Sequence, residues 1–308
     1  MTGPTTARPP LSVLVLTNPA AGGGHAAKAA VRATARLRAR GVEVVNAAGA
    51  DPEDAVRLAR EAAGRGVDAL AVAGGDGMIS LALQALAGTG VPLGVVPAGT
   101  GNDHARAHGL PLGDPEAAAD VVADGHTVTV DLGHATAADG TARWFGSVLA
   151  TGFDSLVSDR TNRLTWPRGR MRYNLAVLVE FANLRPLPFR IELADGTVVE
   201  HDLTLAAVGN TRSYGGGMRI CPDADPADGL LDVTVVRAMP RHRVARFFPS
   251  VFSGTHVRHE EVETHRTPSL RIDSPGITAY ADGEYIGPLP VDVRVAPGAL
   301  RLLVPRPA

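Results

Sequence analysis

Two kinds of segment alternate along the first 130 residues, and their hydrophobic patterns differ. Short apolar runs, typical of buried strands, are followed by longer stretches with apolar residues every three or four positions, as in helices. The expected strands are 11–16, 42–45, 69–73 and 92–96. Helices are expected over 26–40, from Asp51-Pro52 to about residue 63, and after residue 77. This alternation predicts a doubly wound parallel sheet.

The pattern changes after about residue 131, where short strand-like runs are separated by turn pairs such as Asp195-Gly196 and Pro297-Gly298. Strands are expected over 127–130, 144–150, 189–193, 203–208, 231–236, 270–272, 277–280 and 291–295, with one helix over about 170–184. This favours a mostly antiparallel β-sandwich. We therefore expect a disordered lead-in (1–10), an α/β domain (11–130) and a β-sandwich domain (131–295).

Composition limits the classes of function. The 308 residues suffice for one large or two ordinary domains. A formal net charge of −2 leaves no excess of positive charge to neutralise a phosphate backbone, which argues against a nucleic-acid partner. The single cysteine, Cys221, excludes an intramolecular disulfide and indicates a reducing, cytoplasmic setting. No apolar run approaches the roughly 18–20 residues that cross a bilayer.

The most informative local pattern is the junction Gly74-Gly75-Asp76-Gly77, which follows an expected strand and precedes an expected helix. Such a junction presents backbone N–H groups at a helix N-terminus, where phosphate binds readily. A carboxylate at Asp76 suits a Mg²⁺ that accompanies the phosphate. Taken alone, the same four residues are equally compatible with a tight turn.

Two further loops strengthen the phosphate interpretation. One reads Asn18-Pro19 followed by Gly22-Gly23-Gly24, and the other reads Pro97-Ala98-Gly99-Thr100-Gly101-Asn102-Asp103. All three loops follow expected parallel strands, so they can share the crevice at the carboxyl ends of these strands. Neither the dinucleotide fingerprint nor the P-loop is present, which indicates a phosphate site of another type.

Together with Asp282-Gly283-Glu284, these loops resemble the diacylglycerol kinase catalytic superfamily, in particular its soluble bacterial lipid kinases. The resemblance runs from about residue 11 to residue 304. It implies that 11–130 is a nucleotide-binding domain joined by the C-terminal segment 296–308, and that 131–295 is the domain for substrate and metal. Single motifs are shared with NAD kinases and phosphofructokinases, whereas the Gly-Thr-Gly-Asn-Asp run at 99–103 favours the lipid-kinase branch.

The resemblance implies an ATP- and Mg²⁺-dependent kinase that phosphorylates a lipid alcohol, with diacylglycerol as the most frequent acceptor. It implies catalytic roles for Glu284, Asp282 and Asp76, with Glu284 as the base or acceptor near the attacking hydroxyl. The implied nucleotide-binding residues are Asn18, Pro19, Gly22, Gly23, Gly74, Gly75, Asp76, Gly77, Thr100, Gly101, Asn102 and Asp103. From the residues alone, Asp282-Gly283 is also a common hairpin turn.

An acidic, turn-forming loop over 222–230 suits a hard cation such as Mg²⁺. The resemblance implies a structural Mg²⁺ here, held by the Asp228 side chain and by the main chain of Asp225 and Leu230. Asp131 matches an acid near this network, although an ordinary strand-end turn is the other interpretation. The chain departs from the family pattern at Met78, where relatives usually carry Thr, and at Ala227, often a second acid.

These departures keep a catalytically weak nucleotide-binding regulator open beside the lipid kinase, and an NAD kinase-like or other small-molecule kinase is a further alternative. Basic residues around Trp166, including Arg168, and a second basic stretch over 237–246 are compatible with transient docking on an anionic membrane surface. We place Arg168 and Trp166 at the lipid entrance as a hypothesis, with solvated arginines as the alternative. Edge strands of the second domain can pair into a homodimer.

Overall fold

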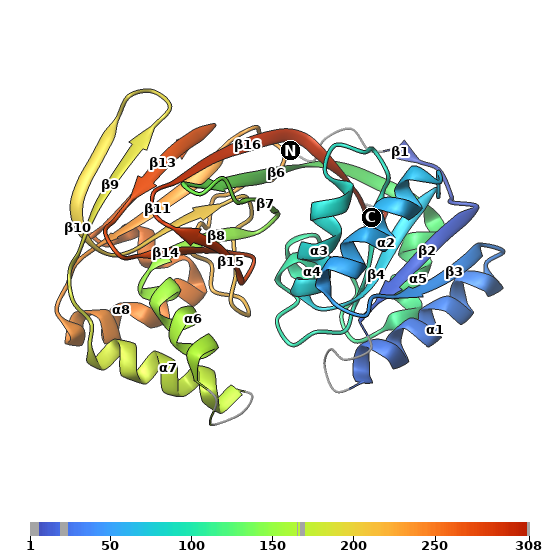
Figure 1. The fold of residues 1–308 in the computed structure, drawn as a ribbon, viewed down its shortest axis with the longest axis horizontal. Coiled ribbons are helices and arrows are strands. Elements are labelled where there is room, and N and C mark those ends of the chain that lie inside the picture. Colours follow the sequence, from blue (N-terminus) through green and yellow to red (C-terminus); the bar gives the residue numbers. More distant parts are fainter. Residues whose placement is uncertain (1–5, 19–23, 165, 167–169, 307–308) are drawn as a thin grey trace. The chain divides into compact units, whose positions relative to one another are not determined.

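The computed structural model describes residues 6–18, 24–164, 166 and 170–306. The chain divides into two compact units, which are labelled by their elements in Figure 1. Unit 1 comprises Met1–Leu132, Pro226–Gly229 and Ala296–Ala308, and unit 2 comprises Gly133–Asp225 and Leu230–Val295. Strands β6 (His126–Ala137) and β16 (Val291–Leu303) contribute residues to both.

Unit 1 contains the predicted parallel sheet. Its strands are β2 (Ser12–Thr17), β3 (Glu43–Ala48), β4 (Ala69–Gly74) and β5 (Leu93–Pro97), in the order β3-β2-β4-β5. The end of β16 adds a further parallel strand, with Leu302 opposite Leu93. The expectation of a disordered lead-in over 1–10 is wrong for the end of that segment, because β1 (Thr6–Ala7) pairs with β6 and Arg8 N–H donates to Gly125 O.

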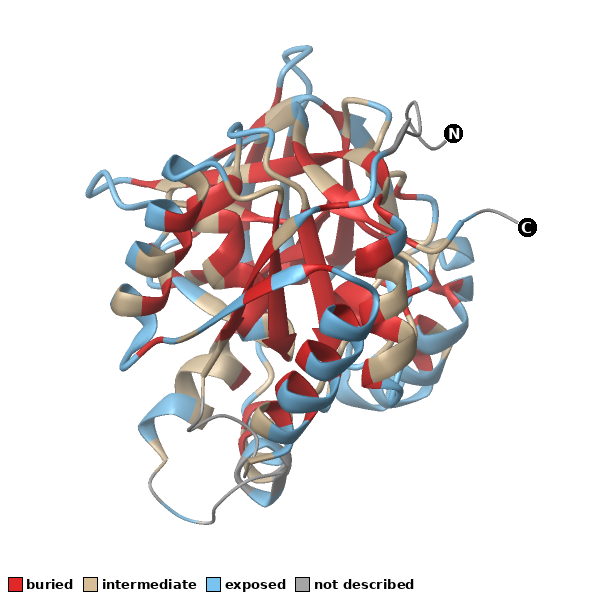
Figure 2. Ribbon diagram, turned by 90° about the vertical axis from the view of Figure 1, so that its right-hand side faces the viewer, coloured by how far each residue is buried: buried red, intermediate tan, exposed pale blue. Residues whose placement is uncertain are grey.

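Helices cover the sheet of unit 1, and Figure 2 shows its buried strands between helices whose outer faces are exposed. They are α1 (His25–Ala39), α2 (Pro52–Gly64), α3 (Asp76–Leu86), α4 (Asp103–Ala107) and α5 (Pro115–Asp124). The Asp51 side chain caps α2 by accepting from Asp54 N–H at 2.8 Å, as the sequence predicts. Asp114 caps α5 in the same way, followed by proline at the first helical position.

Unit 2 is mostly antiparallel, which confirms the predicted fold class. Its strands are β7 (Ala142–Phe145), β8 (Val148–Gly152), β9 (Leu187–Leu193), β10 (Val198–Gly209), β11 (Leu231–Arg237), β12 (Val262–Thr267), β13 (Ser269–Asp273), β14 (Thr278–Ala281) and β15 (Glu284–Pro288). They pair in the order β15-β14-β8-β10-β9-β13-β16, with β11 between β10 and β12. Alternating apolar positions form one core that includes Phe145, Phe189 and Ile191.

Two sequence-based expectations for unit 2 are wrong. The one expected helix corresponds to α7 (Arg170–Ala182). Unit 2 also contains α6 (Phe153–Arg163), α8 (Arg241–Ser253) and the short 3₁₀ helix η2 (Thr255–Arg258), which were not expected. The run expected as one strand over 144–150 is two strands, β7 and β8, interrupted at Gly146 and Ser147. In the described part of the chain, no helix is both long and apolar enough to traverse a bilayer.

Candidate active site

The glycine-rich loops of unit 1 begin at one level of the parallel sheet. Thr17 lies opposite Ala73, and Gly74 lies opposite Pro97, so β2, β4 and β5 end side by side. Asn18 follows directly after β2, while Pro19, Gly22 and Gly23 of the same loop lie outside the described residues. The predicted convergence of the loops after β4 and β5 is therefore present at the carboxyl edge of the sheet.

These two loops touch through bare backbone, which explains their glycines. Ala98 N–H donates to Gly74 O at 2.9 Å. A Cβ on Gly99 would lie 2.4 Å from Gly75 Cα, and a Cβ on Gly101 would lie 2.6 Å from Asp76 Oδ2. Any side chain at these glycines would force the loops apart.

The loop over 97–103 is held by its own polar groups. Asn102 has a positive φ of 53°, and its side chain accepts from Gly99 N–H at 3.0 Å and donates to Gly99 O at 2.9 Å. Arg106 donates to Gly101 O. Asp103 is buried in the first turn of α4, whereas Thr100 is exposed at the loop surface. The loop is thus preorganised and presents Thr100 outward.

The N-terminus of α3 carries the anion-binding features that the sequence predicts. Gly75 is its N-cap residue and provides no capping side chain. Among the described residues, the Gly77 N–H meets no acceptor, and Asp76 Oδ1 accepts only a 3.3 Å bond from His104 N–H. A helix N-terminus with such an N–H group favours a phosphate, and the adjacent carboxylate retains lone pairs for a divalent cation.

Met78, the departure from the family pattern, is a packing residue. Its side chain is buried, and a Cβ on Gly74 would lie 2.6 Å from Met78 Cγ. The apolar side chain therefore fills space beneath the loop over 74–77.

Asp131 holds loops of unit 1 together. Its carboxylate accepts from Gly229 N–H at 2.8 Å and from Gly298 N–H at 2.7 Å, and its own N–H donates to Pro226 O at 2.7 Å. Because both oxygens accept backbone N–H groups, Asp131 is suited to a structural role more than to metal ligation.

The other expected metal ligands lie in, or directly beside, the segment 226–229 that Asp131 binds. Asp228 lies within Pro226–Gly229, while Asp225 and Leu230 immediately precede and follow it and are assigned to unit 2. Across the described residues, no group of three or more His, Cys, Asp or Glu side chains is arranged to hold a metal.

In unit 2, Asp282 and Glu284 lie on the hairpin between β14 and β15. Asp282 and Gly283 have positive φ of 52° and 81°, so the hairpin-turn interpretation is correct as far as the backbone is concerned. The Asp282 carboxylate accepts from the N–H groups of Gly146 and Ser147, each at 2.8 Å, and from the Ser147 hydroxyl. Glu284 is half-buried, and its side chain makes no hydrogen bond or ion pair with a described residue.

Unit 2 also contains an apolar cavity of about 180 Å³. Helices α6, α7 and α8 and strands β10 and β11 line it, through residues that include Phe153, Val177, Phe181 and Phe247. Since one water-sized group requires about 10–15 Å³ of such space, the cavity has room for roughly a dozen of them. It therefore has the size and polarity to hold part of an acyl chain.

Two ionisable residues, Asp154 and Tyr214, lie in the wall of this cavity. Tyr214 donates its hydroxyl proton to Asp154 Oδ2. Burial raises the pKa of Asp154 to about 6. The pKa of Tyr214 is raised well above its usual value, first by burial and then by the neighbouring Asp154 carboxylate.

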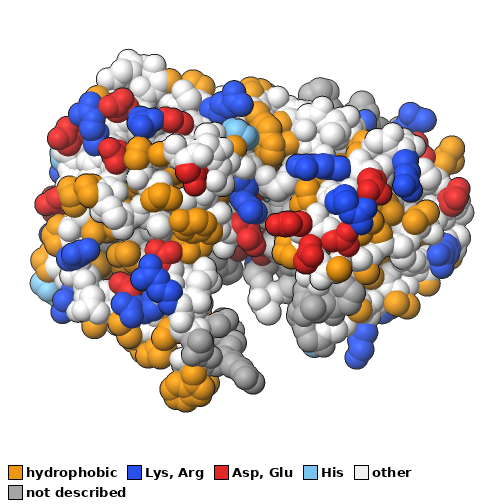
Figure 3. Space-filling view, in the orientation of Figure 1, with side chains coloured by type: hydrophobic (Ala, Val, Ile, Leu, Met, Phe, Trp, Pro, Cys, Tyr) orange, Lys and Arg blue, Asp and Glu red, His pale blue; other side chains and the backbone are white. Residues whose placement is uncertain are grey.

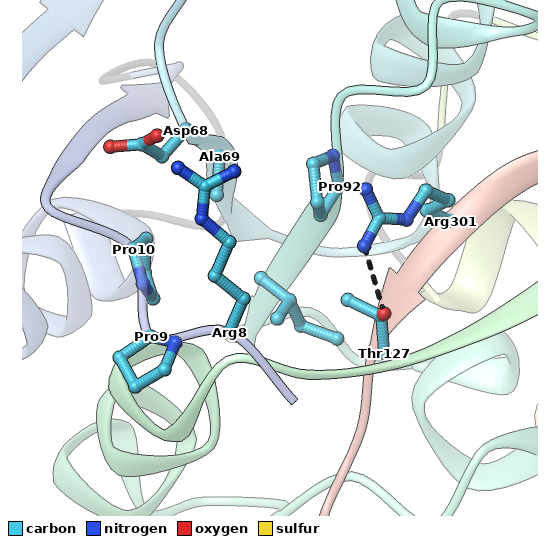
Figure 4. Close-up of a pocket in the computed structure, with 9 residues that line it drawn as sticks. Arg8, Pro9, Pro10, Asp68, Ala69, Pro92, Thr127 and Arg301 are labelled. Carbon is cyan, nitrogen blue, oxygen red and sulfur yellow. Dashed lines mark hydrogen bonds between the residues drawn. The ribbon is translucent and has the colours of Figure 1, made fainter. Parts of the chain in front are cut away.

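A small pocket of unit 1, about 50 Å³, lies at the opposite edge of the sheet from the glycine loops. Figure 4 shows Arg8 and Arg301 in its wall, with Arg301 donating to Thr127 Oγ1 at 3.2 Å. Ala69, where β4 begins, also lines it, so this pocket is at the amino ends of the strands and is separate from the loops after β4 and β5.

Several residues that shape these sites carry no signal in the sequence. Arg106 and Ser147 are partners of Gly101 and Asp282, and nothing in their local sequence marks them. The cavity lining comes from positions between 153 and 251 that share no spacing. Only the cap signature of α5, Asp114-Pro115, offered an unused signal, because it repeats the signature of α2.

Comparison with protein families gives two matches along the chain. Residues 12–135 match the model of the diacylglycerol kinase catalytic domain, and residues 147–304 match that of the YegS C-terminal NAD kinase beta sandwich-like domain. Together these matches contain the glycine loops after β4 and β5 and the Asp282–Glu284 hairpin.

Curated relatives cover most of the chain. It is 54% identical to a diacylglycerol kinase of Mycobacterium tuberculosis (strain H37Rv), over 96% of this chain and 95% of the relative. It is 31% identical to a probable YegS-like lipid kinase of Stenotrophomonas maltophilia, over 89% of this chain and 90% of that protein. A structure titled as a putative diacylglycerol kinase from Bacillus anthracis has a similar fold, with a TM-score of 0.78, 24% identity, and coverage of 96% and 97%.

Proposed function

This chain belongs to the diacylglycerol kinase family and is a lipid kinase, and we propose that it transfers the γ-phosphoryl group of ATP to the hydroxyl of diacylglycerol. The observation that carries the proposal is the contact between the loops of 74–77 and 97–103 at the N-terminus of α3. The M. tuberculosis relative, named a diacylglycerol kinase, supports diacylglycerol as the acceptor.

We assign the nucleotide phosphates to unit 1. The N–H groups at the start of α3 and the Thr100 hydroxyl are positioned to bind them, and Asn102 fixes the loop. Asp76 would hold a Mg²⁺ beside these phosphates, and the ion would supply charge neutralisation during transfer. Because the family resemblance implies it, we also propose a second, structural Mg²⁺ that the Asp228 side chain and the main chain of Asp225 and Leu230 would hold.

We assign the acceptor lipid to unit 2. Glu284 is a half-buried carboxylate whose oxygens bond to no other described group, so it is available to accept a proton from an attacking hydroxyl. Asp282 is a positioning residue, since its carboxylate binds Gly146 and Ser147. The apolar cavity of unit 2 supports a lipid acceptor because it offers room for a fatty chain.

The test is transfer of labelled γ-phosphate from ATP to dioleoylglycerol in mixed micelles, with and without Mg²⁺. We expect Mg²⁺-dependent formation of phosphatidic acid and a loss of about 100- to 10,000-fold in kcat for Glu284→Gln. Glu260→Gln is the matched control, since the Glu260 side chain is 82% exposed and bonds only Arg243. Labelling of NAD instead of diacylglycerol, or full activity of Glu284→Gln, would overturn the proposal.

We further propose that the protein is cytoplasmic, where ATP is supplied, and that it meets its acceptor at the inner face of the membrane.

A further inference from the structure

Exposed apolar side chains are concentrated on one part of unit 2. Twelve large hydrophobic residues are exposed among the described residues, and half of them lie on α7, on α8 or at position 166, shortly before α7. They are Trp166, Met171, Tyr173, Leu178, Phe248 and Phe252. Figure 3 shows orange side chains along the lower edge of α7, and Figure 1 shows α7 and α8 on the same side of the strands of unit 2. Such concentration is unusual for a surface that faces only water.

Helix α8 combines this apolar surface with positive charge. Arg241, Phe248 and Phe252 are separated by seven and four residues, so they share one face of the helix. The Phe248 and Phe252 rings pack edge to face at 5.7 Å, and both are nearly half exposed. A neighbouring face of the helix, with Phe247 and Val251, is buried.

The charge of α8 has one sign. The helix contains three arginines and no acidic residue. Arg243 pairs with Glu261 at 2.5 Å and with Glu260 at 3.4 Å, whereas Arg241 and Arg246 are exposed and form no ion pair with a described residue. Arg241 therefore adds uncompensated positive charge to the face of α8 that carries the two exposed aromatic rings.

This face adjoins the apolar cavity. Phe248 lines the cavity and is at the same time 45% exposed, so its ring stands where the cavity reaches the surface. Val177 and Phe181 bring α7 to the same cavity wall. A ligand that enters past Phe248 would pass directly from the exposed apolar surface into the cavity.

We propose that the exposed faces of α7 and α8, with Trp166, form a docking surface for an anionic lipid bilayer at the mouth of the cavity. Aromatic side chains partition into the interfacial region of a bilayer, and arginines are attracted by anionic headgroups. This assignment rests on the proposed lipid kinase function, because a diacylglycerol acceptor must leave the bilayer through an apolar passage. It moves the main contact from Arg168, which lies outside the described residues, to α8.

Vesicle sedimentation tests the surface without catalysis. We compare vesicles of phosphatidylcholine alone with vesicles that also contain phosphatidylglycerol, using wild type, Phe252→Ser and Arg241→Glu. Neither residue lines the cavity. Phe252→Ser should weaken binding to anionic vesicles about tenfold, and Arg241→Glu should weaken it at least fivefold. The matched controls, Leu112→Ser and Arg65→Glu, change exposed residues of unit 1 and should bind as wild type.

Activity toward a dispersed short-chain diacylglycerol in detergent separates this inference from the proposed function. Phe252→Ser should keep wild-type activity there and lose it selectively on anionic vesicles. Wild-type binding by both α8 variants, or equal binding to neutral and anionic vesicles, would overturn the docking surface. So would conversion of a dimer into a monomer by Phe252→Ser with vesicle binding unchanged, since the face would then join two copies of the chain. Failure of wild type to phosphorylate any diacylglycerol would instead refute the proposed function and leave the binding result standing.

Discussion

Separate substitutions of Asp282 and Glu284, the two acidic residues of one hairpin, should distinguish a structural role from a catalytic one. We expect Asp282→Asn to lower stability with a modest effect on rate, and Glu284→Gln to lower the rate with little effect on stability. The difference follows from their contacts, because Asp282 binds two backbone N–H groups at 2.8 Å while the Glu284 side chain bonds to no described residue.

The magnitude for Asp282 follows from the number of bonds that the amide can retain. Asn at this position keeps one acceptor oxygen and turns an NH₂ group toward the other N–H, so one charge-assisted bond is lost and a donor is left unpaired. Such a loss costs about 1.5–3 kcal/mol. This is a substantial share of the roughly 5–15 kcal/mol that stabilises an ordinary domain. The midpoint of urea unfolding should fall by about 0.5–1.5 M.

The assay combines urea unfolding with kcat for diacylglycerol phosphorylation at a saturating ATP concentration. Glu284→Gln should unfold at the wild-type midpoint and lose about 100- to 10,000-fold in kcat, whereas Asp282→Asn should lose less than tenfold. An unfolding midpoint for Asp282→Asn equal to wild type would refute the structural assignment. A wild-type rate for Glu284→Gln would refute the catalytic one.

Three further predictions follow from contacts in the two units. Gly99→Ala should reduce ATP affinity at least tenfold in calorimetry, because its Cβ would lie 2.4 Å from Gly75 Cα, while the control Gly64→Ala has open space and should bind normally. Asp131→Asn should destabilise by about 1.5–3 kcal/mol in urea unfolding whether or not Mg²⁺ is present; a difference that appears only with Mg²⁺ would assign the carboxylate to the metal. Burial raises the folded-state pKa of Asp154 from 3.8 to about 6, so this group lowers stability as pH rises from about 4 through 6. Asp154→Asn should therefore increase the free energy of unfolding at pH 8 by up to roughly 3 kcal/mol, which a higher Tm would show, and should leave Tm nearly unchanged at pH 4. An equal change in Tm at both pH values would contradict the raised pKa of Asp154 as the cause.

Local patterns predicted the strands β2 to β5 and the helices α1 to α3 of unit 1, because short-range rules decide them there. The register of β4 and β5, with Gly74 opposite Pro97, follows from two apolar runs that each end at a glycine loop. The sequence also marked Gly99 as part of a candidate phosphate loop, although the reason for a glycine there, the contact with Gly75, appears only in the fold. Sequence signals were sufficient where the interacting groups lie at the ends of neighbouring strands.

Long-range contacts explain what the sequence did not predict in unit 2. The run over 144–150 is apolar enough for one strand, yet Asp282, about 135 positions away, draws the N–H groups of Gly146 and Ser147 out of the ladder. Helix α6 has polar residues over most of its length and only Ser155 and Val157 fully buried, so its periodicity is weak. The cavity likewise depends on side chains from five elements and has no local signature.

Helix α6 connects the two parts of unit 2 that we assign to the acceptor, the apolar cavity and the Glu284 hairpin. Phe153, in its first turn, lines the cavity. Asp159, further along the helix, accepts from Thr278 Oγ1 at 2.8 Å and from the Tyr280 hydroxyl at 2.7 Å, and both residues belong to the strand that leads into the Glu284 hairpin. Helix α6 therefore links the wall of the cavity to the strand that precedes the hairpin. If a fatty chain fills the cavity as we propose, the energy of its binding can contribute through α6 to the position of Glu284, and such remote contacts then raise kcat as well as affinity.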